Sequence, residues 1–203
     1  MRKLGKPASR LGDEFFLSDT VSLARDLLGS LLVTAVSGKR VSGRIVEVEA
    51  YLGSGDPACH ACRGITKRNE VMFRSPGHCY VYLIYGMYHC VNVVSDPEGV
   101  GAAVLIRAVE PREGLEVMAR RRGISQARLR DLARGPGRLC EAFGIKRQIS
   151  GERFATSRKI WLERGTGVPE NKICVTGRIG IRLGAELPLR FFEAGSRFVS
   201  GRH

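Results

Sequence analysis

The residues from Tyr80 to Val94, YVYLIYGMYHCVNVV, constrain the fold of this chain more than any other stretch. Aromatic and β-branched side chains fill this run almost completely, which is typical of strands, and Gly86 in its middle predicts the tip of a β-hairpin. Because side chains alternate between faces along a strand, Tyr80 and Tyr82 point to one face and Val81 points to the other. The sequence therefore predicts an antiparallel hairpin with a tyrosine-rich face.

The tip of this hairpin carries large side chains, Tyr85, Met87 and Tyr88, beside Gly86. Turns normally take small polar residues. In one interpretation the tip packs under another element as part of the core. In the other it is exposed and contacts a partner. The residues of the hairpin alone leave both interpretations open.

A second predicted strand, GRIVEVEAYL at residues 43–52, places Glu47, Glu49 and Tyr51 on one face. Glutamate is depleted in strands, so two on one face need an explanation. The face is either exposed to solvent, with its glutamates paired to nearby arginines, or it holds a carboxylate inside a positively charged cleft. In the second case the carboxylate could act as a base or stabilise a developing positive charge.

The chain is strongly basic, with 33 lysine and arginine residues against 20 acidic residues and a net charge of +13. Such an excess is typical of proteins that bind a polyanion, and nucleic acid is the leading candidate. A ribosomal or RNA-binding protein would fit the charge equally well. The charge therefore predicts a class of partner but no activity.

The opening residues, MRKLGKPASRLG, lack the apolar run of a signal peptide, and no segment approaches the roughly 20 apolar residues of a membrane helix. We expect a cytoplasmic protein with reduced cysteines, associated with the nucleoid if the source is prokaryotic. Cys59 and Cys62 have the spacing of half a zinc site, but a second close pair is missing. No metal is therefore expected.

The remaining segments alternate between short periodic elements and turns. The residues after Asp19 predict a helix, and residues 31–36 predict a strand that forms a hairpin with residues 43–52. The apolar strand at 101–109 carries one charge, Arg107, which needs a partner. The long loop at 53–74 has little periodicity, which favours a functional role. Further helices are predicted at residues 113–122, 126–134 and 138–143, and further strands at Trp161, 173–175, 179–183 and 191–192.

Long motifs follow one another over most of the chain: GRIVEVEAYLG at 43–53, YVYLIYGMYHCVN at 80–92, LIRAVEP at 105–111, GPGRLC at 135–140 and RIGI at 178–181. From Phe15 to Ser200 the chain resembles the alkyladenine (3-methyladenine) DNA glycosylase family, the monofunctional type unrelated to the helix-hairpin-helix glycosylases. The resemblance implies a mixed α/β (α+β) fold with a curved, largely antiparallel β-sheet and surrounding helices. It also implies one compact domain over residues 1–203, of which 1–14 form a flexible N-terminal segment.

The resemblance implies a DNA repair enzyme of base excision repair. Such an enzyme flips alkylated or deaminated purines, of the 3-methyladenine, 7-methylguanine and hypoxanthine class, out of duplex DNA. It then hydrolyses the N-glycosidic bond and leaves an abasic site without a lyase step. The implied partner is double-stranded DNA with damaged purines, bound by a monomer that uses no cofactor and no membrane.

Residue roles follow from the same resemblance. The family's water-activating glutamate matches Glu49, and its intercalating tyrosine matches Tyr85. An aromatic wedge at a hairpin tip can fill the gap that an extruded base leaves in the stack. The other matches are the base-binding residues Tyr51, His60, Tyr82, Asn92 and Arg107 and the DNA contacts Thr66, Arg68, Met87 and Tyr88.

The sequence departs from the family pattern at two places. His89 follows Tyr88 where relatives can have an aromatic residue, and the loop between His60 and Thr66 is about one residue shorter than in some relatives. Both departures concern phosphate contacts and the range of damage rather than the reaction.

Two other classes of function remain as alternatives. A metal-dependent nuclease could use Glu47, Glu49 and Asp56 as ligands around magnesium, and a chelator would then inhibit it. A non-catalytic nucleic-acid-binding protein of the same fold would use the basic surface and the aromatic tip, and Glu49 would be dispensable.

Overall fold

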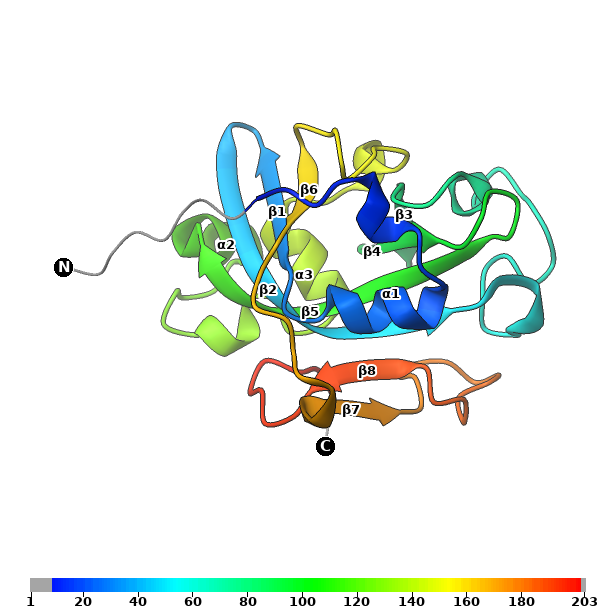
Figure 1. Cartoon of the computed structure of the whole chain (residues 1–203). Coiled ribbons are helices and arrows are strands. Elements are labelled where there is room, and N and C mark those ends of the chain that lie inside the picture. Colours follow the sequence, from blue (N-terminus) through cyan, green and yellow to red (C-terminus); the bar gives the residue numbers. More distant parts are fainter. Residues whose placement is uncertain (1–8, 202–203) are drawn as a thin grey trace.

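One antiparallel sheet runs through the molecule in the computed structural model, which describes residues 9–201 (Figure 1). Its main path has the strand order β3-β4-β5-β2-β1-β6, and β8 joins β2 to β7. All pairings of these strands are antiparallel, so the predicted mixed α/β fold with a largely antiparallel sheet is confirmed. The strands are β1 (Leu31–Val36), β2 (Lys39–Tyr51), β3 (Cys79–Ile84), β4 (Tyr88–Ser95), β5 (Ala102–Glu113), β6 (Ile160–Glu163), β7 (Ile173–Thr176) and β8 (Arg190–Glu193).

Strand β2 is the long central strand, and it bends. Its first half pairs with β1, whereas Glu47, Val48 and Glu49 pair with β8. Its register with β5 shifts between Ile45 and Glu47 and again between Glu47 and Val48. Such bulges bend a strand and re-aim its side chains. Next to the bend, Glu47 contacts Arg190 of β8, and Glu49 contacts Ile179 in the segment between β7 and β8. These two strands lie beneath the rest of the molecule in Figure 1.

The helices are α1 (Thr20–Leu27), α2 (Leu115–Arg122) and α3 (Pro136–Phe143). Asp19 caps α1 by accepting the N–H groups of Val21 and Ser22, as the sequence predicts. Helix α1 packs on β2 and β5, and α3 packs on β4 and β5. The largest core cluster lies between these helices and the sheet, and includes Leu23, Leu27, Val48, Ile106, Leu139 and Phe143.

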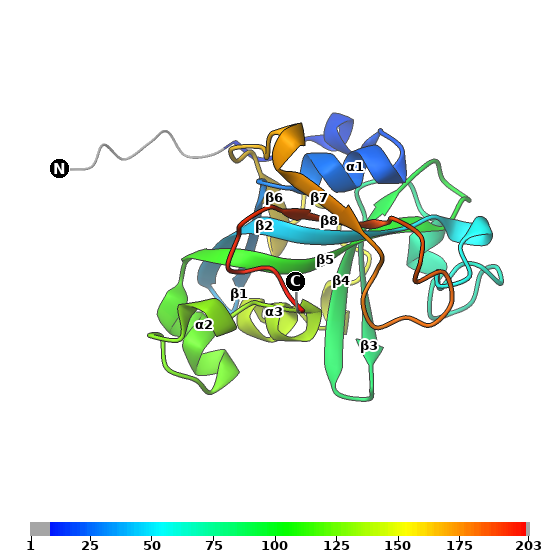
Figure 2. The same ribbon diagram turned by 90° about the horizontal axis from the view of Figure 1, so that it is seen from below.

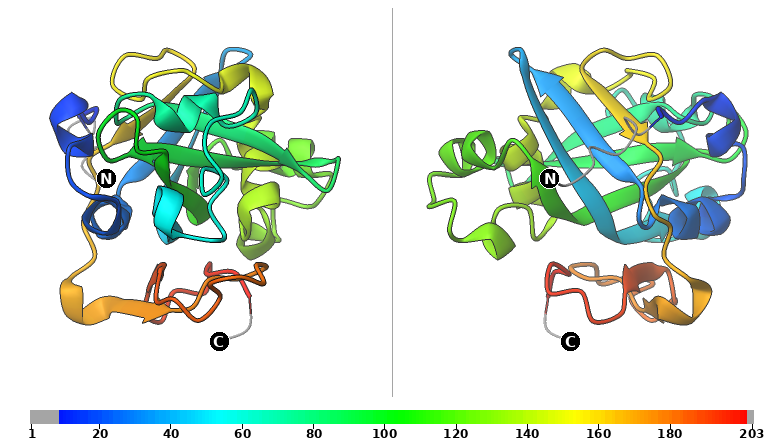
Figure 3. Two further views of the ribbon diagram at one scale, coloured as in Figure 1. Left: turned by 90° about the vertical axis from the view of Figure 1, so that its right-hand side faces the viewer. Right: turned by 60° about the vertical axis from the view of Figure 1, so that its left-hand side comes forward.

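The predicted hairpins at residues 31–52 and 80–94 are both present. The second one, β3 with β4, extends beyond the neighbouring strands (Figure 2) and projects from the body of the protein in the left view of Figure 3. At its tip, Tyr85 and Gly86 both have positive φ angles, of 52° and 69°. Glycine adopts this conformation without steric cost, which explains its place in the turn.

Two predicted elements are wrong. Residues 126–134 form no α-helix, only a 3-10 turn at Leu129–Asp131. The chain has to return to the sheet there, because Ala133 O accepts the N–H of Val109 and Arg134 forms a bridge with Ala108. Tertiary pairing thus overrides the local helix propensity. Residues 179–183 form no strand either.

Residues 1–8 of the predicted flexible segment 1–14 lie outside the described residues. The rest of that segment contacts β6: Leu11 is buried and its N–H donates to Leu162 O at 2.9 Å. No helix within residues 9–201 combines the length and the apolar character needed to cross a membrane.

Candidate active site

A pocket of about 590 Å³ opens between the β3–β4 hairpin, the end of β2 and the start of α3. Seven of the residues predicted for base or DNA binding line it, which brings together segments far apart in the sequence. They are Tyr51, His60, Tyr82, Tyr85, Tyr88, Asn92 and Arg107. The faces of the hairpin strands are as predicted, because Tyr80, Tyr82 and Ile84 all line this pocket.

Glu49 lies directly behind the pocket wall, and its side chain is completely buried. Its Oε2 accepts the hydroxyl of Tyr51 at 2.9 Å. Its Oε1 accepts the N–H of Ile179 at 2.7 Å and lies 3.1 Å from Arg107 Nη1. Because Tyr51, Arg107 and Ile179 all line the pocket, each partner of Glu49 also faces the space that a ligand would occupy.

Glu47, two residues earlier on the same face, is buried in a separate network. Its Oε1 accepts Nε–H groups from Arg107 at 2.9 Å and Arg190 at 2.8 Å, and its Oε2 accepts the N–H of Ser200 at 2.6 Å. Arg107 thus bridges the two glutamates, which supplies the partner that its place in an apolar strand required. The solvent-facing interpretation of this strand is wrong, because both carboxylates have no exposure.

Electrostatics explain why Arg107 remains charged inside the protein. Burial alone would lower its pKa, but the neighbouring carboxylates of Glu49 and Glu47 raise the pKa above the usual value. At Tyr51, burial and the neighbouring carboxylate act in the same direction. Burial, followed by the negative charge of Glu49, raises the pKa of Tyr51 far above the ordinary range, so its hydroxyl stays protonated and donates to Glu49.

Aromatic rings form one wall of the pocket. The rings of His60 and Tyr82 meet edge to face at 4.4 Å between centroids, and the centroids of Tyr80 and Tyr82 are 5.5 Å apart. His60 Nδ1 lies 3.0 Å from the hydroxyl of Tyr80. Burial and then the charge of Arg68 lower the pKa of His60, which leaves a neutral imidazole in the wall at neutral pH. Burial raises the pKa of Tyr80 to about 12.

Asn92 also belongs to this wall. It is buried opposite Tyr80 in the β3–β4 pairing, and its side-chain amide donates to Tyr80 O at 3.0 Å. This hydrogen bond fixes the orientation of the Asn92 amide in the pocket wall.

The tip of the hairpin is exposed at the mouth of the pocket. Tyr85 is 77% exposed, Met87 65% and Tyr88 45%. The tip is therefore exposed and does not pack in the core, whereas its contact with a partner stays a prediction. Tyr85 and Tyr88 line the pocket, whereas Met87 lies with Tyr88 along a separate groove of about 940 Å³ between the hairpin, α3 and the end of β1.

The other predicted DNA contacts lie in the loop that follows β2. Thr66 is exposed, and its N–H and hydroxyl donate to the side chain of Asn69. Arg68 is also exposed; its guanidinium stands 5.7 Å from the ring centre of Tyr82 and donates to Leu83 O. The structure thus places Arg68, but not Thr66, against the hairpin.

Several residues of the site were missed by the sequence analysis. Ile179 was predicted to lie in a strand, but it belongs to a loop in which Gly180 has a φ of 79°. The N–H of Ile179 donates a hydrogen bond to Glu49. The glycine between two isoleucines in the RIGI motif was the one local signal that this segment is a loop rather than a strand. Arg190 and Ser200 hold Glu47, and no local pattern indicated that role.

The cysteine pair of the sequence lies near this site as free thiols. Cys59 is buried with its thiol directed to Gly101 O, and Cys62 is partly exposed. Within residues 9–201, no three His, Cys, Asp or Glu side chains are arranged so that they could hold a metal ion.

Comparison with known proteins identifies the family of this chain. A family model described as methylpurine-DNA glycosylase (MPG) matches residues 14–197. A protein of Methanoculleus marisnigri with the provisional name 3-methyladenine DNA glycosylase is 49% identical over 191 residues, which is 93% of this chain and 97% of the relative.

Two further relatives carry the same provisional name. One, from Methanocella arvoryzae, is 46% identical over 192 residues, covering 93% of this chain and 94% of the relative. The other, from Mesorhizobium japonicum, is 49% identical over 183 residues, covering 90% and 86%. The family match spans the pocket, both buried glutamates and the exposed hairpin, and the chain belongs to the methylpurine-DNA glycosylase (MPG) family of DNA glycosylases.

Proposed function

We propose that this protein extrudes alkylated or deaminated purines from duplex DNA and hydrolyses their N-glycosidic bond with a water activated by Glu49. The observation that supports this most directly is the burial of Glu49 behind an aromatic pocket whose lining residues are its own hydrogen-bond partners. An alkylated purine that carries positive charge would stack favourably against the rings of Tyr51 and Tyr82.

In the proposed reaction, the leaving base, the attacking water and the Glu49 carboxylate lie around C1′ of the sugar. As the bond from C1′ to the base nitrogen breaks, its electron pair leaves with the base and the sugar becomes oxocarbenium-like. Water adds to C1′, and its proton passes to the Glu49 carboxylate. The carboxylate also stabilises the positive charge of the sugar, and Arg107 keeps it in place through the contact at 3.1 Å.

Glu49 Oε2 is the oxygen that we assign to the water. It accepts one hydrogen bond, from Tyr51, and a carboxylate oxygen can accept two. Since the side chain is fully covered, the water enters through a small shift of the wall formed by Tyr51 and Arg107. The described residues lining the pocket include no lysine, which supports direct hydrolysis over a covalent amine intermediate.

The two alternatives are less compatible with these contacts. In a nuclease the carboxylates would have to be free for magnesium, but Glu47 and Glu49 are bonded to Arg107, and Asp56 to Arg178. A pure binding module would have no use for a buried glutamate whose partners face the pocket. Base release in the presence of EDTA distinguishes a glycosylase from a nuclease and from a binding module.

The first test is release of free base in the presence of EDTA. Duplexes carrying 3-methyladenine, 7-methylguanine or hypoxanthine are incubated with the protein, and released base is separated by chromatography. We expect free base and an intact backbone with an abasic site, since hydrolysis by Glu49 needs no metal. Backbone cleavage that EDTA abolishes would identify a nuclease, and tight binding without any released base would identify a binding module.

Tyr85→Ala tests the wedge. Removing the exposed ring leaves the pocket and Glu49 intact, so the extruded state should be less populated. Because a stacked aromatic contributes about 1–3 kcal/mol, binding to damaged duplex should weaken by roughly tenfold. The defect should shrink on mismatched lesions, where unpairing costs less. Equilibrium binding curves on paired and mismatched duplexes measure both effects.

Tyr85→Phe is the matched control, because it keeps the ring at the same positive φ angle and should bind almost as well as the wild type. An equal loss in Tyr85→Ala and Tyr85→Phe, or a loss that is the same on mismatched DNA, would rule out the wedge.

A further inference from the structure

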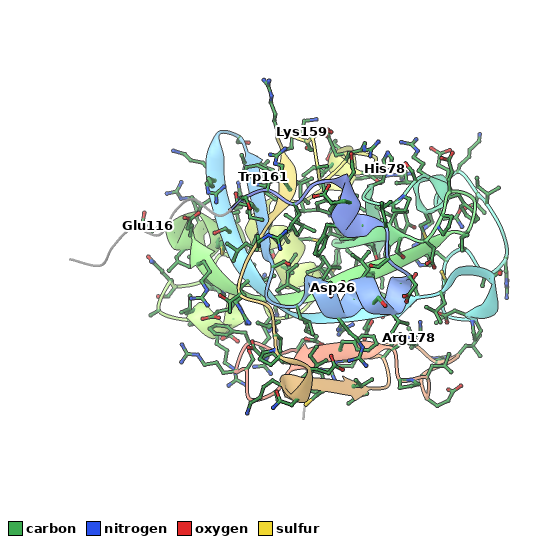
Figure 4. The ribbon with its side chains drawn as sticks, in the orientation of Figure 1. Asp26, His78, Glu116, Lys159, Trp161 and Arg178 are labelled. Atoms are coloured by element: carbon green, nitrogen blue, oxygen red, sulfur yellow. The ribbon has the colours of Figure 1, made fainter. Side chains whose placement is uncertain are left out.

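A fully buried ion pair, Arg178 with Asp56, lies behind the pocket wall. Arg178 Nη2 donates to Asp56 Oδ1 at 2.7 Å, and Nη1 contacts Oδ2. Neither side chain has any exposure. Burial opposes the charge of Asp56, but the hydrogen bonds from Arg178 lower its pKa below the usual value. In Figure 4, Arg178 is labelled where the layer of β7 and β8 meets the rest of the molecule.

Arg178 connects three segments of the chain. Besides Asp56, in the loop after β2, it donates to Ala50 O at 3.0 Å and to Gly184 O at 3.2 Å. Ala50 is next to both Glu49 and Tyr51, and Gly184 closes the loop that begins at Arg178. The planar, forked guanidinium can serve several acceptors at fixed angles, which a lysine ammonium does not do.

Arg178 is next to two parts of the active site, one in space and one along the chain. The central carbon of its guanidinium is 4.7 Å from the ring centre of Tyr51, a lining residue of the pocket. The residue after it, Ile179, donates its N–H to Glu49 Oε1 at 2.7 Å. Arg178 itself does not line the pocket, so it acts on a substrate only through these neighbours.

We infer that Arg178, held by Asp56, is a positioning residue for the glycosylase reaction. It fixes the ring of Tyr51, against which the extruded base stacks, and it fixes the Ile179 amide that orients the Glu49 carboxylate. This inference rests on the proposed roles of Glu49 and Tyr51. A role in stability alone would predict that loss of Arg178 affects folding but not the rate of base release in the folded protein.

Arg178→Lys is the main variant, because it keeps the charge and removes the fork. We expect its single-turnover rate of base release to fall by up to about 100-fold, as a small misplacement of catalytic groups can cause. Its dissociation constant for damaged duplex should change much less than the rate, because the wedge and the basic surface are untouched. Rates are measured at a temperature where circular dichroism shows the variant to be folded.

Arg44→Lys is the matched control. Arg44 also forms a two-point ion pair in β2, with Glu193, and also donates to a backbone carbonyl, Thr166 O, but it does not line the pocket. Because its ion pair is partly exposed, Arg44→Lys should lose less stability than Arg178→Lys, and it should keep the wild-type rate of base release. Equal rate losses in Arg44→Lys and Arg178→Lys would overturn the inference, as would a wild-type rate in folded Arg178→Lys.

If Arg178→Lys does not fold, the double variant Arg178→Lys with Asp56→Glu is measured in its place. The longer glutamate can reach the shorter lysine, so stability should be restored, whereas the rate should stay low because the plane against Tyr51 is missing. If the double variant recovers both its stability and its rate of base release, the pair of Arg178 and Asp56 has only a structural role. If Glu49→Gln is inactive while these variants are fully active, the positioning role alone fails and the proposed function stands.

Discussion

Glu49→Gln should lower the single-turnover rate of base release by about 10²- to 10⁴-fold, the range typical of a lost general base. Glutamine has the shape and reach of glutamate but neither its charge nor its basicity. Binding to damaged duplex should stay close to the wild-type level, because the carboxylate acts mainly in the transition state. Rapid-mixing measurements of released base, together with binding curves, check both expectations.

The surroundings of Glu49 should accept a glutamine without unfolding. If the amide oxygen takes the Oε1 position, it still accepts from Ile179 and Arg107. The amide nitrogen then faces the Tyr51 hydroxyl, which can rotate and accept a hydrogen bond instead of donating one. A melting temperature near the wild-type value would therefore show that a lost rate reflects lost chemistry. A near wild-type rate would refute the assignment of Glu49 as the base.

Glu47→Gln should give the opposite phenotype, with a loss of stability of about 3–5 kcal/mol, the usual cost of breaking a buried ion pair. Both oxygens of Glu47 face N–H donors: Oε1 accepts from Arg107 and Arg190, and Oε2 from Ser200. Either orientation of a glutamine would place its NH₂ group against one of these donors. Two buried arginines would also lose the charge between them.

Chemical denaturation measures this loss, and Glu110→Gln is its matched control. Glu110 pairs with Arg112 near the surface, where such pairs contribute less than about 1 kcal/mol. In the folded fraction, Glu47→Gln should lose far less activity than Glu49→Gln. A stable Glu47→Gln protein without activity would mean that the roles of the two glutamates are reversed.

The contrast between these two glutamates shows where sequence reasoning ends. Alternation along a strand placed Glu47, Glu49 and Tyr51 on one face, and both glutamates do reach Arg107. The same pattern fits a solvated face equally well. Burial depends on what covers the face, and here that includes Arg190 and Ser200, more than 140 residues away along the chain.

The other elements also fall into two groups, those that local sequence predicts and those that depend on long-range contacts. The two hairpins and the α1 cap were predictable because their determinants are local: β-branched and aromatic runs, a glycine at a turn and an aspartate before a helix. The helix expected at residues 126–134 failed because that segment is held to the sheet edge by the bridge between Ala108 and Arg134. Local propensity does not register such a long-range bridge.

The sequence by itself determined the antiparallel hairpins, the basic character and, through long ordered motifs, the family. Only the tertiary structure decided that Tyr85 is exposed, that Arg107 bridges two carboxylates and that Arg178 lies behind Tyr51. Strand and turn preferences act between neighbours along the chain. Burial and charge pairing are properties of groups that meet only after the sheet has bent at β2 and β8 has paired with it.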